Sequence, residues 1–222
     1  MQSFLKKNIL FIFGMIATAE IITRLFPGNQ ADYFLKPLLL PLLMIAVLVY
    51  TKASTPRSII LTGLFFSFAG DTLLLFEEKN ALFFIGGLIC FLITHLLYCW
   101  YFLKAAAKAV SYLKNKPLVI LTVLVYTTGL LFLLFPSLGD LKIPVLLYAT
   151  VLSLMLLCSI HAINHFKIAW HFVTGALFFV ISDSLLAINK FYAPFSYAGF
   201  FIMLTYCLAQ FLIVKGYIKN NE

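Results

Sequence analysis

The sequence is organised in long, predominantly apolar runs separated by short polar connections, and this pattern decides the fold class. The runs are 17 to 23 residues long, the length that an α-helix needs to cross about 30 Å of hydrocarbon. A membrane barrel would need alternating strands of roughly ten residues, and these runs do not alternate. We therefore predict an all-α integral membrane protein of about eight transmembrane helices, at residues 8–26, 35–51, 58–76, 81–103, 117–135, 143–160, 168–188 and 196–216.

Composition excludes a water-soluble domain and argues against a nucleic-acid partner. Hydrophobic residues make up 63% of the chain and charged residues 11%, whereas soluble domains carry about 25% charged residues. The net charge is +8, but the basic residues are scattered at the ends of the runs and form no nucleic-acid-binding patch. The cysteines fall inside apolar runs without metal-ligand spacing, so we expect them to pack in the core and expect no metal or other cofactor: Cys90, Cys99, Cys158 and Cys207.

The distribution of Lys and Arg predicts the orientation, because cytoplasmic loops carry an excess of these residues. Alternate connections carry 11 and 5 of them, the larger set being Lys6, Lys7, Lys52, Arg57, Lys104, Lys108, Lys114, Lys116, Lys167, Lys215 and Lys219. Both termini are then cytoplasmic. Ala17-Thr18-Ala19 imitates a signal-peptide cleavage site, but the apolar run continues to Phe26, which predicts an uncleaved first helix.

An internal repeat links the third and seventh runs. Residues 63–74 align with residues 175–186 at an offset of 112, and the aligned Gly, Phe, Asp, Leu and Leu are identical. Gly87 and Gly199 keep this offset, and Lys36-Pro37 has a weak counterpart in Lys142-Ile143-Pro144. Four helices per half would place both halves the same way up. We therefore predict one membrane domain over residues 1–222, built from parallel halves at about 1–110 and 111–222.

Several ionisable residues lie within the apolar runs, where each charge costs at least a few kcal/mol and asks for a reason. Glu20, Asp71 and Asp183 lie in the first, third and seventh runs. Lys36 begins the second run and His95 lies within the fourth. In the predicted orientation the three acids and the lysine fall in the outer half of the membrane, with the histidine deeper. They can therefore converge on one polar cavity, with the two aspartates related by an approximate twofold axis.

Simpler structural roles compete with this interpretation. Asp71 and Lys36 could form an ion pair that only holds two helices together. However, one lysine cannot be the partner of two acids at equivalent positions of the repeat. His95 could equally bond a neighbouring backbone carbonyl. Interhelical hydrogen bonding is the default role of the remaining polar residues within the runs, which are Tyr98, Tyr126, Tyr148, Tyr206, Asn189 and Gln210.

The combination of these motifs resembles the YhhN-type lysoplasmalogenase family, and the resemblance covers essentially the whole chain. The matching motifs are Lys36-Pro37, Gly70-Asp71, His95 followed by Tyr98, and Ser182-Asp183 with Leu185-Leu186-Ala187 behind it. The resemblance implies hydrolysis of the vinyl-ether bond of lysoplasmalogens, giving a fatty aldehyde and glycerophospho-ethanolamine or -choline. It also implies a lysophospholipid substrate in the bilayer, a bacterial inner-membrane location and no obligatory protein partner.

The residues suit this chemistry in their own right. A vinyl ether opens in acid, when its β-carbon takes a proton, an oxocarbenium ion forms and water adds. Such a site needs one protonated carboxylic acid and one carboxylate, as glycosidases do for a similar transition state. We therefore expect Asp71 and Asp183 to be catalytic, and Lys36 to hold the substrate phosphate as a point charge. The other expected substrate-binding residues are His95, Glu20, Tyr98 and Asn189.

Two other classes of function fit the same pattern. Parallel repeats with acids near the midplane are also typical of proton-coupled carriers, and composition does not separate a carrier from a hydrolase. A non-catalytic scaffold or sensor, in which the acids only pair with Lys36 and His95, is the third hypothesis. Release of aldehyde by the purified protein would select the hydrolase, whereas flux of substrate without turnover would select the carrier.

Overall fold

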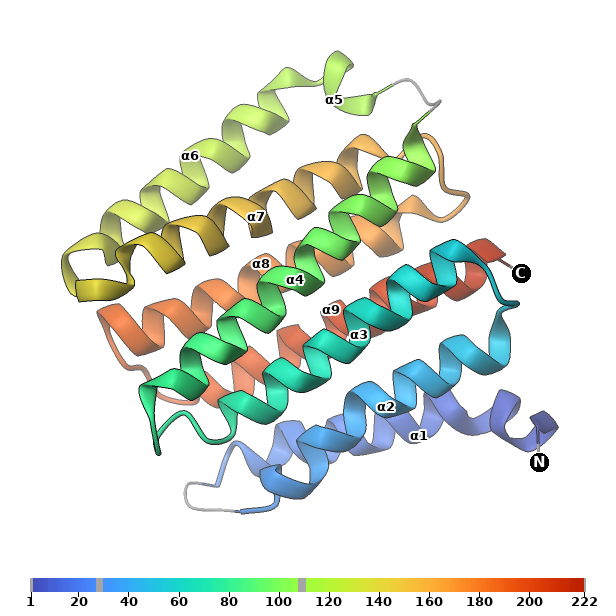
Figure 1. Cartoon of the computed structure of the whole chain (residues 1–222), viewed down its shortest axis with the longest axis horizontal. Helices are drawn as coiled ribbons and strands as arrows, with labels where there is room; N and C mark the ends of the chain where they lie inside the picture. Colours follow the sequence, from blue (N-terminus) through green and yellow to red (C-terminus); the bar gives the residue numbers. More distant parts are fainter. Residues whose placement is uncertain (1, 27–29, 108–110, 222) are drawn as a thin grey trace. The chain divides into compact units, whose positions relative to one another are not determined.

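The computed structural model describes residues 2–26, 30–107 and 111–221, and in this part of the chain every regular element is a helix (Figure 1). Residues 27–29, which lie between the first two predicted runs, are outside what the structure describes, as are the side chain of Lys7 and the whole of Lys108. The long helices are α1 (Gln2–Thr23), α2 (Asp32–Tyr50), α3 (Thr55–Leu74), α4 (Ala81–Ala106), α6 (Pro117–Leu134), α7 (Lys142–His161), α8 (Ala169–Ala187) and α9 (Ala198–Asn221).

The predicted all-α integral membrane fold is confirmed. In the described residues seven helices are long and apolar enough to cross a membrane, and the apolar part of α1, Asn8–Thr23, is a shorter candidate. Each long helix matches one predicted run. The cytoplasmic placement of the termini remains a prediction.

Helix ends differ from the predictions where a helix extends into polar sequence. α4 continues to Ala106 and α9 to Asn221, past the predicted ends at 103 and 216. Hydropathy indicates only the part of a helix that lies in the hydrocarbon layer. A helix continues as long as its backbone hydrogen bonds are formed, so these ends could not be predicted from the apolar runs. Short elements were also missed, namely the one-turn α5 (Tyr112–Asn115), the 3₁₀ turns Phe135–Ser137 and Gly139–Leu141, and the π-helix Ile188–Tyr192.

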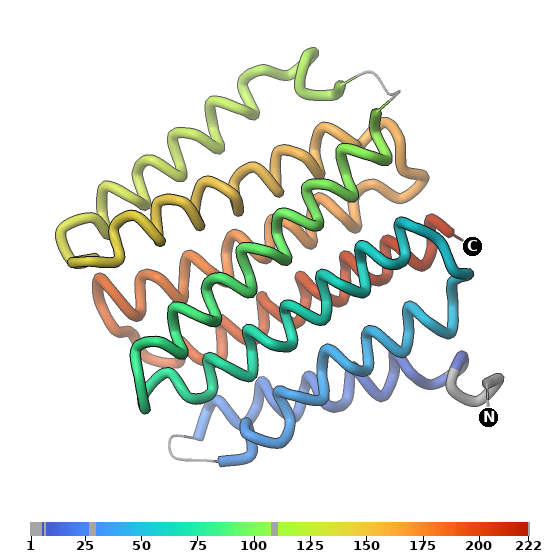
Figure 2. The backbone as a smooth tube through the Cα atoms, viewed as in Figure 1, coloured from blue at the N-terminus to red at the C-terminus, as the bar shows by residue number. Residues whose placement is uncertain are grey.

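The chain divides into two compact units, Met1–Tyr98 with Tyr217–Glu222, and Cys99–Gly216. In the first unit α1, α2 and α3 follow one another as antiparallel neighbours (Figure 1). In the second unit α6, α7 and α8 do the same, as the backbone tube shows (Figure 2). The predicted repeat halves and the twofold relation between them remain predictions.

Small residues bring helices together closely within each unit. In the first, a Cβ added at Gly63 of α3 would lie 2.8 Å from Tyr98 Cε1 on α4, and one at Gly70 would lie 2.9 Å from Phe91. In the second, a Cβ at Gly175 of α8 would lie 2.8 Å from Ile213 Cγ1 on α9. Such small-residue contacts are how transmembrane helices pack without a hydrophobic driving force. They hold the aspartate-bearing helices α3 and α8 against the helix that follows each of them.

We expect Gly175→Ala to destabilise the protein. The added Cβ would also lie 3.1 Å from the carbonyl oxygen of Ala209 and 3.2 Å from the amide nitrogen of Ile213, and these backbone atoms cannot rotate away. Overpacking of this kind costs about 1–3 kcal/mol, which thermal unfolding in detergent would measure. Gly129→Ala on α6 is the matched control, because nothing lies within 4 Å of its added Cβ. Equal melting temperatures for the two variants would contradict the expected clash.

Candidate active site

A buried ion pair joins α2 and α3. Lys36 Nζ lies 3.2 Å from Asp71 Oδ1, and the two side chains are 11% and 3% exposed. The interaction considered above as a structural alternative is therefore formed. Binding of the substrate phosphate by Lys36 remains a prediction, and any phosphate would approach an ammonium group that already contacts Asp71.

A second group of charges lies where α1 and α2 meet. Glu20 is fully buried and accepts hydrogen bonds from Arg24 Nη2 at 2.6 Å and from Arg24 Nε at 3.0 Å. Arg24 Nη1 also lies 3.2 Å from Asp32 Oδ2 in the first turn of α2. Two carboxylates and one cation therefore form a polar cluster within the first unit, made of Glu20, Arg24 and Asp32, and the Lys36–Asp71 pair lies in the same unit.

One oxygen of this cluster has no hydrogen bond. Glu20 Oε2 is buried and has no partner among the described residues, while Oε1 is bound by Arg24. The partner of Glu20 is thus an arginine one helical turn away, the spacing at which opposite charges on a helix meet. The binding of substrate by Glu20 remains a prediction.

We expect Arg24→Met to destabilise the protein strongly. The change would leave the buried Glu20 carboxylate without its main counter-charge, and removing one partner of a buried ion pair costs about 3–5 kcal/mol. Thermal unfolding would show a large loss in Arg24→Met and recovery in the double variant Arg24→Met/Glu20→Gln. Lys79→Met, at an exposed lysine over the Phe76 ring, is the control. A double variant no more stable than Arg24→Met would show that the charge pairing is not the cause.

Polar side chains also join α3 to α4. Ser67 Oγ donates to Thr94 Oγ1 at 3.2 Å, and the Thr94 hydroxyl lies 3.0 Å from the Gly63 carbonyl oxygen. The neighbouring His95 is fully buried, with its ring stacked on Phe91 at a centroid distance of 6.4 Å. Tyr98 is fully buried one turn further on. Tyr98 therefore packs against Gly63 of α3 and His95 against Phe91 of its own helix, and the substrate-binding roles of both remain predictions.

In the second unit the other aspartate is held by a tyrosine. The Tyr148 hydroxyl on α7 donates to Asp183 Oδ2 on α8 at 2.5 Å. Beside it the Tyr126 hydroxyl on α6 donates to Ser184 Oγ at 2.8 Å. Asn189 lies in the π-helix that continues α8, where its Oδ1 accepts from the Phe195 amide at 3.2 Å. Binding of substrate by Asn189 remains a prediction, and its side-chain oxygen already orders this connection.

The contacts around the two aspartates recur at the offset of the sequence repeat. Adding 112 to the pair Lys36 and Asp71 gives Tyr148 and Asp183, and both pairs are in contact. Ser67 and Thr94, which form a hydrogen bond, correspond in the same way to Phe179 and Tyr206, whose rings are in contact with a centroid distance of 5.8 Å. Gly70 and Cys90, which approach closely, correspond to Ser182 and Ile202, which are joined by a hydrogen bond from the Ser182 hydroxyl to the Ile202 carbonyl oxygen. The helix series α2–α3–α4 and α7–α8–α9 thus share equivalent internal contacts.

Sequence reasoning did not identify the partners of two carboxylates, Arg24 for Glu20 and Tyr148 for Asp183, although it expected Tyr148 to hydrogen-bond between helices and signals for both partners existed. Arg24 was counted only as a loop charge, but its spacing of four from Glu20 predicts a pair. Tyr148 stands at an offset of 112 from Lys36, whereas the weak counterpart proposed at Lys142 does not keep that offset. A comparison by position instead of by residue identity would have found Tyr148.

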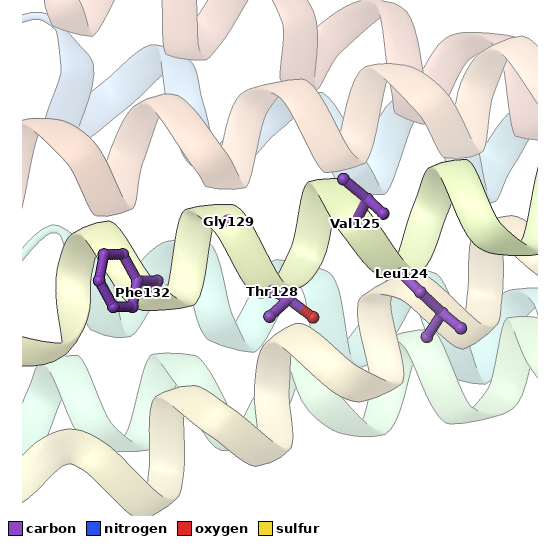
Figure 3. Close-up of a pocket in the computed structure, with 5 residues that line it drawn as sticks. All are labelled: Leu124, Val125, Thr128, Gly129 and Phe132. Atoms are coloured by element: carbon purple, nitrogen blue, oxygen red, sulfur yellow. The ribbon is translucent and has the colours of Figure 1, made fainter.

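A hollow of about 410 Å³ lies on α6 (Figure 3). It is lined by Leu124, Val125, Thr128, Gly129 and Phe132. None of these side chains titrates, so this hollow does not supply acid–base chemistry. In the described residues no three His, Cys, Asp or Glu side chains gather in a way that could hold a metal ion.

The comparisons with known proteins decide the family. The model of the YhhN family matches residues 31–217, which include both aspartates and their partners. The chain belongs to the YhhN family. A protein of Bos taurus named Lysoplasmalogenase TMEM86A is 30% identical over 169 residues, which cover 73% of this chain and 66% of that protein. Its Homo sapiens counterpart is 31% identical over 172 residues, with the same coverage.

A bacterial relative matches over a longer stretch. The protein named Lysoplasmalogenase of Mycobacterium bovis is 29% identical over 217 residues, which cover 95% of this chain and 81% of the relative. The match to the mammalian relatives spans 66% of their length. No solved structure matches this YhhN protein.

Proposed function

We propose that this YhhN protein is a lysoplasmalogenase. Its substrate is a lysophospholipid with a vinyl-ether chain, and its products are a fatty aldehyde and glycerophosphoethanolamine or glycerophosphocholine. The relatives named lysoplasmalogenase support this activity. The observation that carries the proposal is the repeated aspartate, because Asp71 and Asp183 each contact a partner at the same offset in the preceding helix.

The proposed chemistry uses one carboxylic acid and one carboxylate. The acid protonates the β-carbon of the vinyl ether, and the resulting oxocarbenium ion is stabilised by the carboxylate. The carboxylate then accepts a proton from the water that adds to the cation. Paired acids of this kind serve the oxocarbenium-like transition states of glycosidases. Asp71 and Asp183 are the residues proposed for the two roles.

An assay of the purified protein in lipid tests the proposal. We expect it to release aldehyde from a lysoplasmalogen, and to leave unchanged a lysophospholipid whose chain is held by a saturated ether. The saturated analogue has the same headgroup and chain but has no double bond to protonate, so it is the matched control. Transport of lysoplasmalogen across vesicle membranes without aldehyde release would contradict the hydrolase and favour the carrier.

A further inference from the structure

A buried carboxylate oxygen near the end of α1 is left without a hydrogen bond. Glu20 is fully buried, and in residues 2–26, 30–107 and 111–221 its Oε2 has no partner. Its Oε1 accepts both of the hydrogen bonds from Arg24. An unsatisfied buried acceptor costs free energy, and the cost is larger when the group is charged. A ligand that donates a hydrogen bond to Oε2 would remove this penalty.

The charges around Glu20 favour a cation as that ligand. In the described part of the chain, Arg24 is the one cation in ion-pair contact with Glu20 and Asp32. Two carboxylates therefore face one guanidinium group, which leaves one formal negative charge uncompensated. Both oxygens of Asp32 have partners, because Oδ1 accepts from the Tyr33 amide at 3.1 Å and Oδ2 lies 3.2 Å from Arg24 Nη1. The unfilled acceptor position is thus on Glu20, within a cluster of net negative charge.

The cluster reaches the surface of the first unit through its other two members. The side chains of Arg24 and Asp32 are 24% and 19% exposed, so a ligand can approach from their side. Because Glu20 itself is fully buried, the long side chain of Arg24 has to turn aside to admit a ligand to Oε2. In the predicted orientation the end of α1 and the start of α2 lie at the outer membrane surface, the level of lipid headgroups.

Helix α2 connects this cluster to the first aspartate of the proposed reaction. Asp32 and Lys36 are four residues apart, so they lie one turn apart on the same face of α2. Lys36 Nζ lies 3.2 Å from Asp71 Oδ1. A headgroup held at Glu20 would therefore lie at the end of the α2 face that leads to Asp71. The glycerophosphate of the substrate is long enough to span the turn between Asp32 and Lys36.

We propose that Glu20 determines headgroup specificity by binding the primary ammonium group of ethanolamine. This inference rests on the proposed hydrolase function and deepens it by naming the headgroup. A primary ammonium group has three N–H donors, one of which satisfies Oε2, and its charge offsets the net negative charge of the cluster. The quaternary ammonium group of choline has the charge but no N–H, so it would leave Oε2 unsatisfied. Sites that hydrogen-bond a substrate N–H reject analogues that lack it.

The first test compares kcat/KM for two lysoplasmalogens that have the same vinyl-ether chain and different headgroups. The wild type should prefer the ethanolamine substrate over the choline substrate at least tenfold. Glu20→Gln keeps an oxygen for Arg24 but places an amide N–H₂ group at the position of Oε2, so the ammonium meets a donor instead of an acceptor. This variant should lose most of the preference, through a lower kcat/KM for the ethanolamine substrate alone.

The ratio of the two kcat/KM values separates recognition from stability, because a partly unfolded variant loses activity on both substrates equally. Glu78→Gln is the matched control, since it removes the same formal charge from an exposed residue and should keep the wild-type ratio. An absent preference in the wild type, or an unchanged ratio in Glu20→Gln, would overturn the proposal.

A binding test does not depend on the reaction. Glycerophosphoethanolamine should raise the melting temperature of the wild type in detergent more than glycerophosphocholine does at the same concentration, because a ligand that binds the folded state stabilises it. Glu20→Gln should abolish this difference. Equal or absent shifts with the two compounds in the wild type would overturn the proposal, even if aldehyde is released. Absence of aldehyde release with a preserved difference would refute the proposed function and support the headgroup site, so the two failures are distinguishable.

Discussion

Asp71→Asn and Asp183→Asn should each abolish measurable aldehyde release while leaving a folded, extractable protein. Asn keeps the shape of Asp and much of its hydrogen bonding, but it can neither supply the acidic proton nor become an anion. General acid–base contributions are typically about 10²- to 10⁴-fold, and each variant removes one of the two groups that the proposed mechanism needs. The measurement is aldehyde release from a lysoplasmalogen in detergent or vesicles, at matched protein concentrations.

Thermal unfolding of the same preparations is the control for this result. Ser184→Ala is a useful matched variant, because it changes the residue next to Asp183 and removes only the hydrogen bond from Tyr126 and the one that Ser184 donates to the Val180 carbonyl oxygen within α8. We expect Ser184→Ala to retain most of the activity. Near wild-type turnover in either Asn variant would refute the paired-aspartate mechanism.

The eight helices could be predicted from the sequence because crossing the hydrocarbon layer sets both the hydropathy and the length of a helix. A segment that crosses hydrocarbon must be apolar over about 30 Å, so each run predicts one helix. The ends of α4 and α9 could not be predicted in this way, since their last residues lie beyond the apolar runs and a helix can continue past the hydrocarbon layer. The π-helix Ile188–Tyr192 was missed because its composition does not differ from that of an α-helix end.

The acidic residues of the candidate site could be singled out from the sequence, but only one of their partners could. A charge in an apolar run is conspicuous, so Asp71, Asp183 and Glu20 were found, and Lys36 was proposed as a partner of Asp71. Tyr148 was expected only to hydrogen-bond between helices, and its pairing with Asp183 was not predicted because Tyr148 differs in identity from Lys36. Its role depends on a contact between α7 and α8, which residue types alone do not encode.

Lys36→Met should destabilise the protein, by about 3–5 kcal/mol, because it leaves a buried carboxylate without its counter-charge. Lys36 and Asp71 are both buried and 3.2 Å apart, so solvent cannot replace the lost partner. The double variant Lys36→Met/Asp71→Asn should recover most of this stability, since both members of the pair are then neutral. A double-mutant cycle by thermal unfolding in detergent measures the coupling between them.

The same Lys36→Met variant separates the ion-pair role from phosphate binding. A lysine that holds the substrate phosphate equally in the ground and transition states would raise KM and leave kcat unchanged. A lysine that serves only as the partner of Asp71 would lower kcat and leave KM nearly unchanged, because Asp71 is proposed to act in the chemical steps and not in substrate binding. We expect the second result, since the ammonium group already contacts Asp71. An increase in KM alone, with stability preserved, would show that the lysine serves the headgroup.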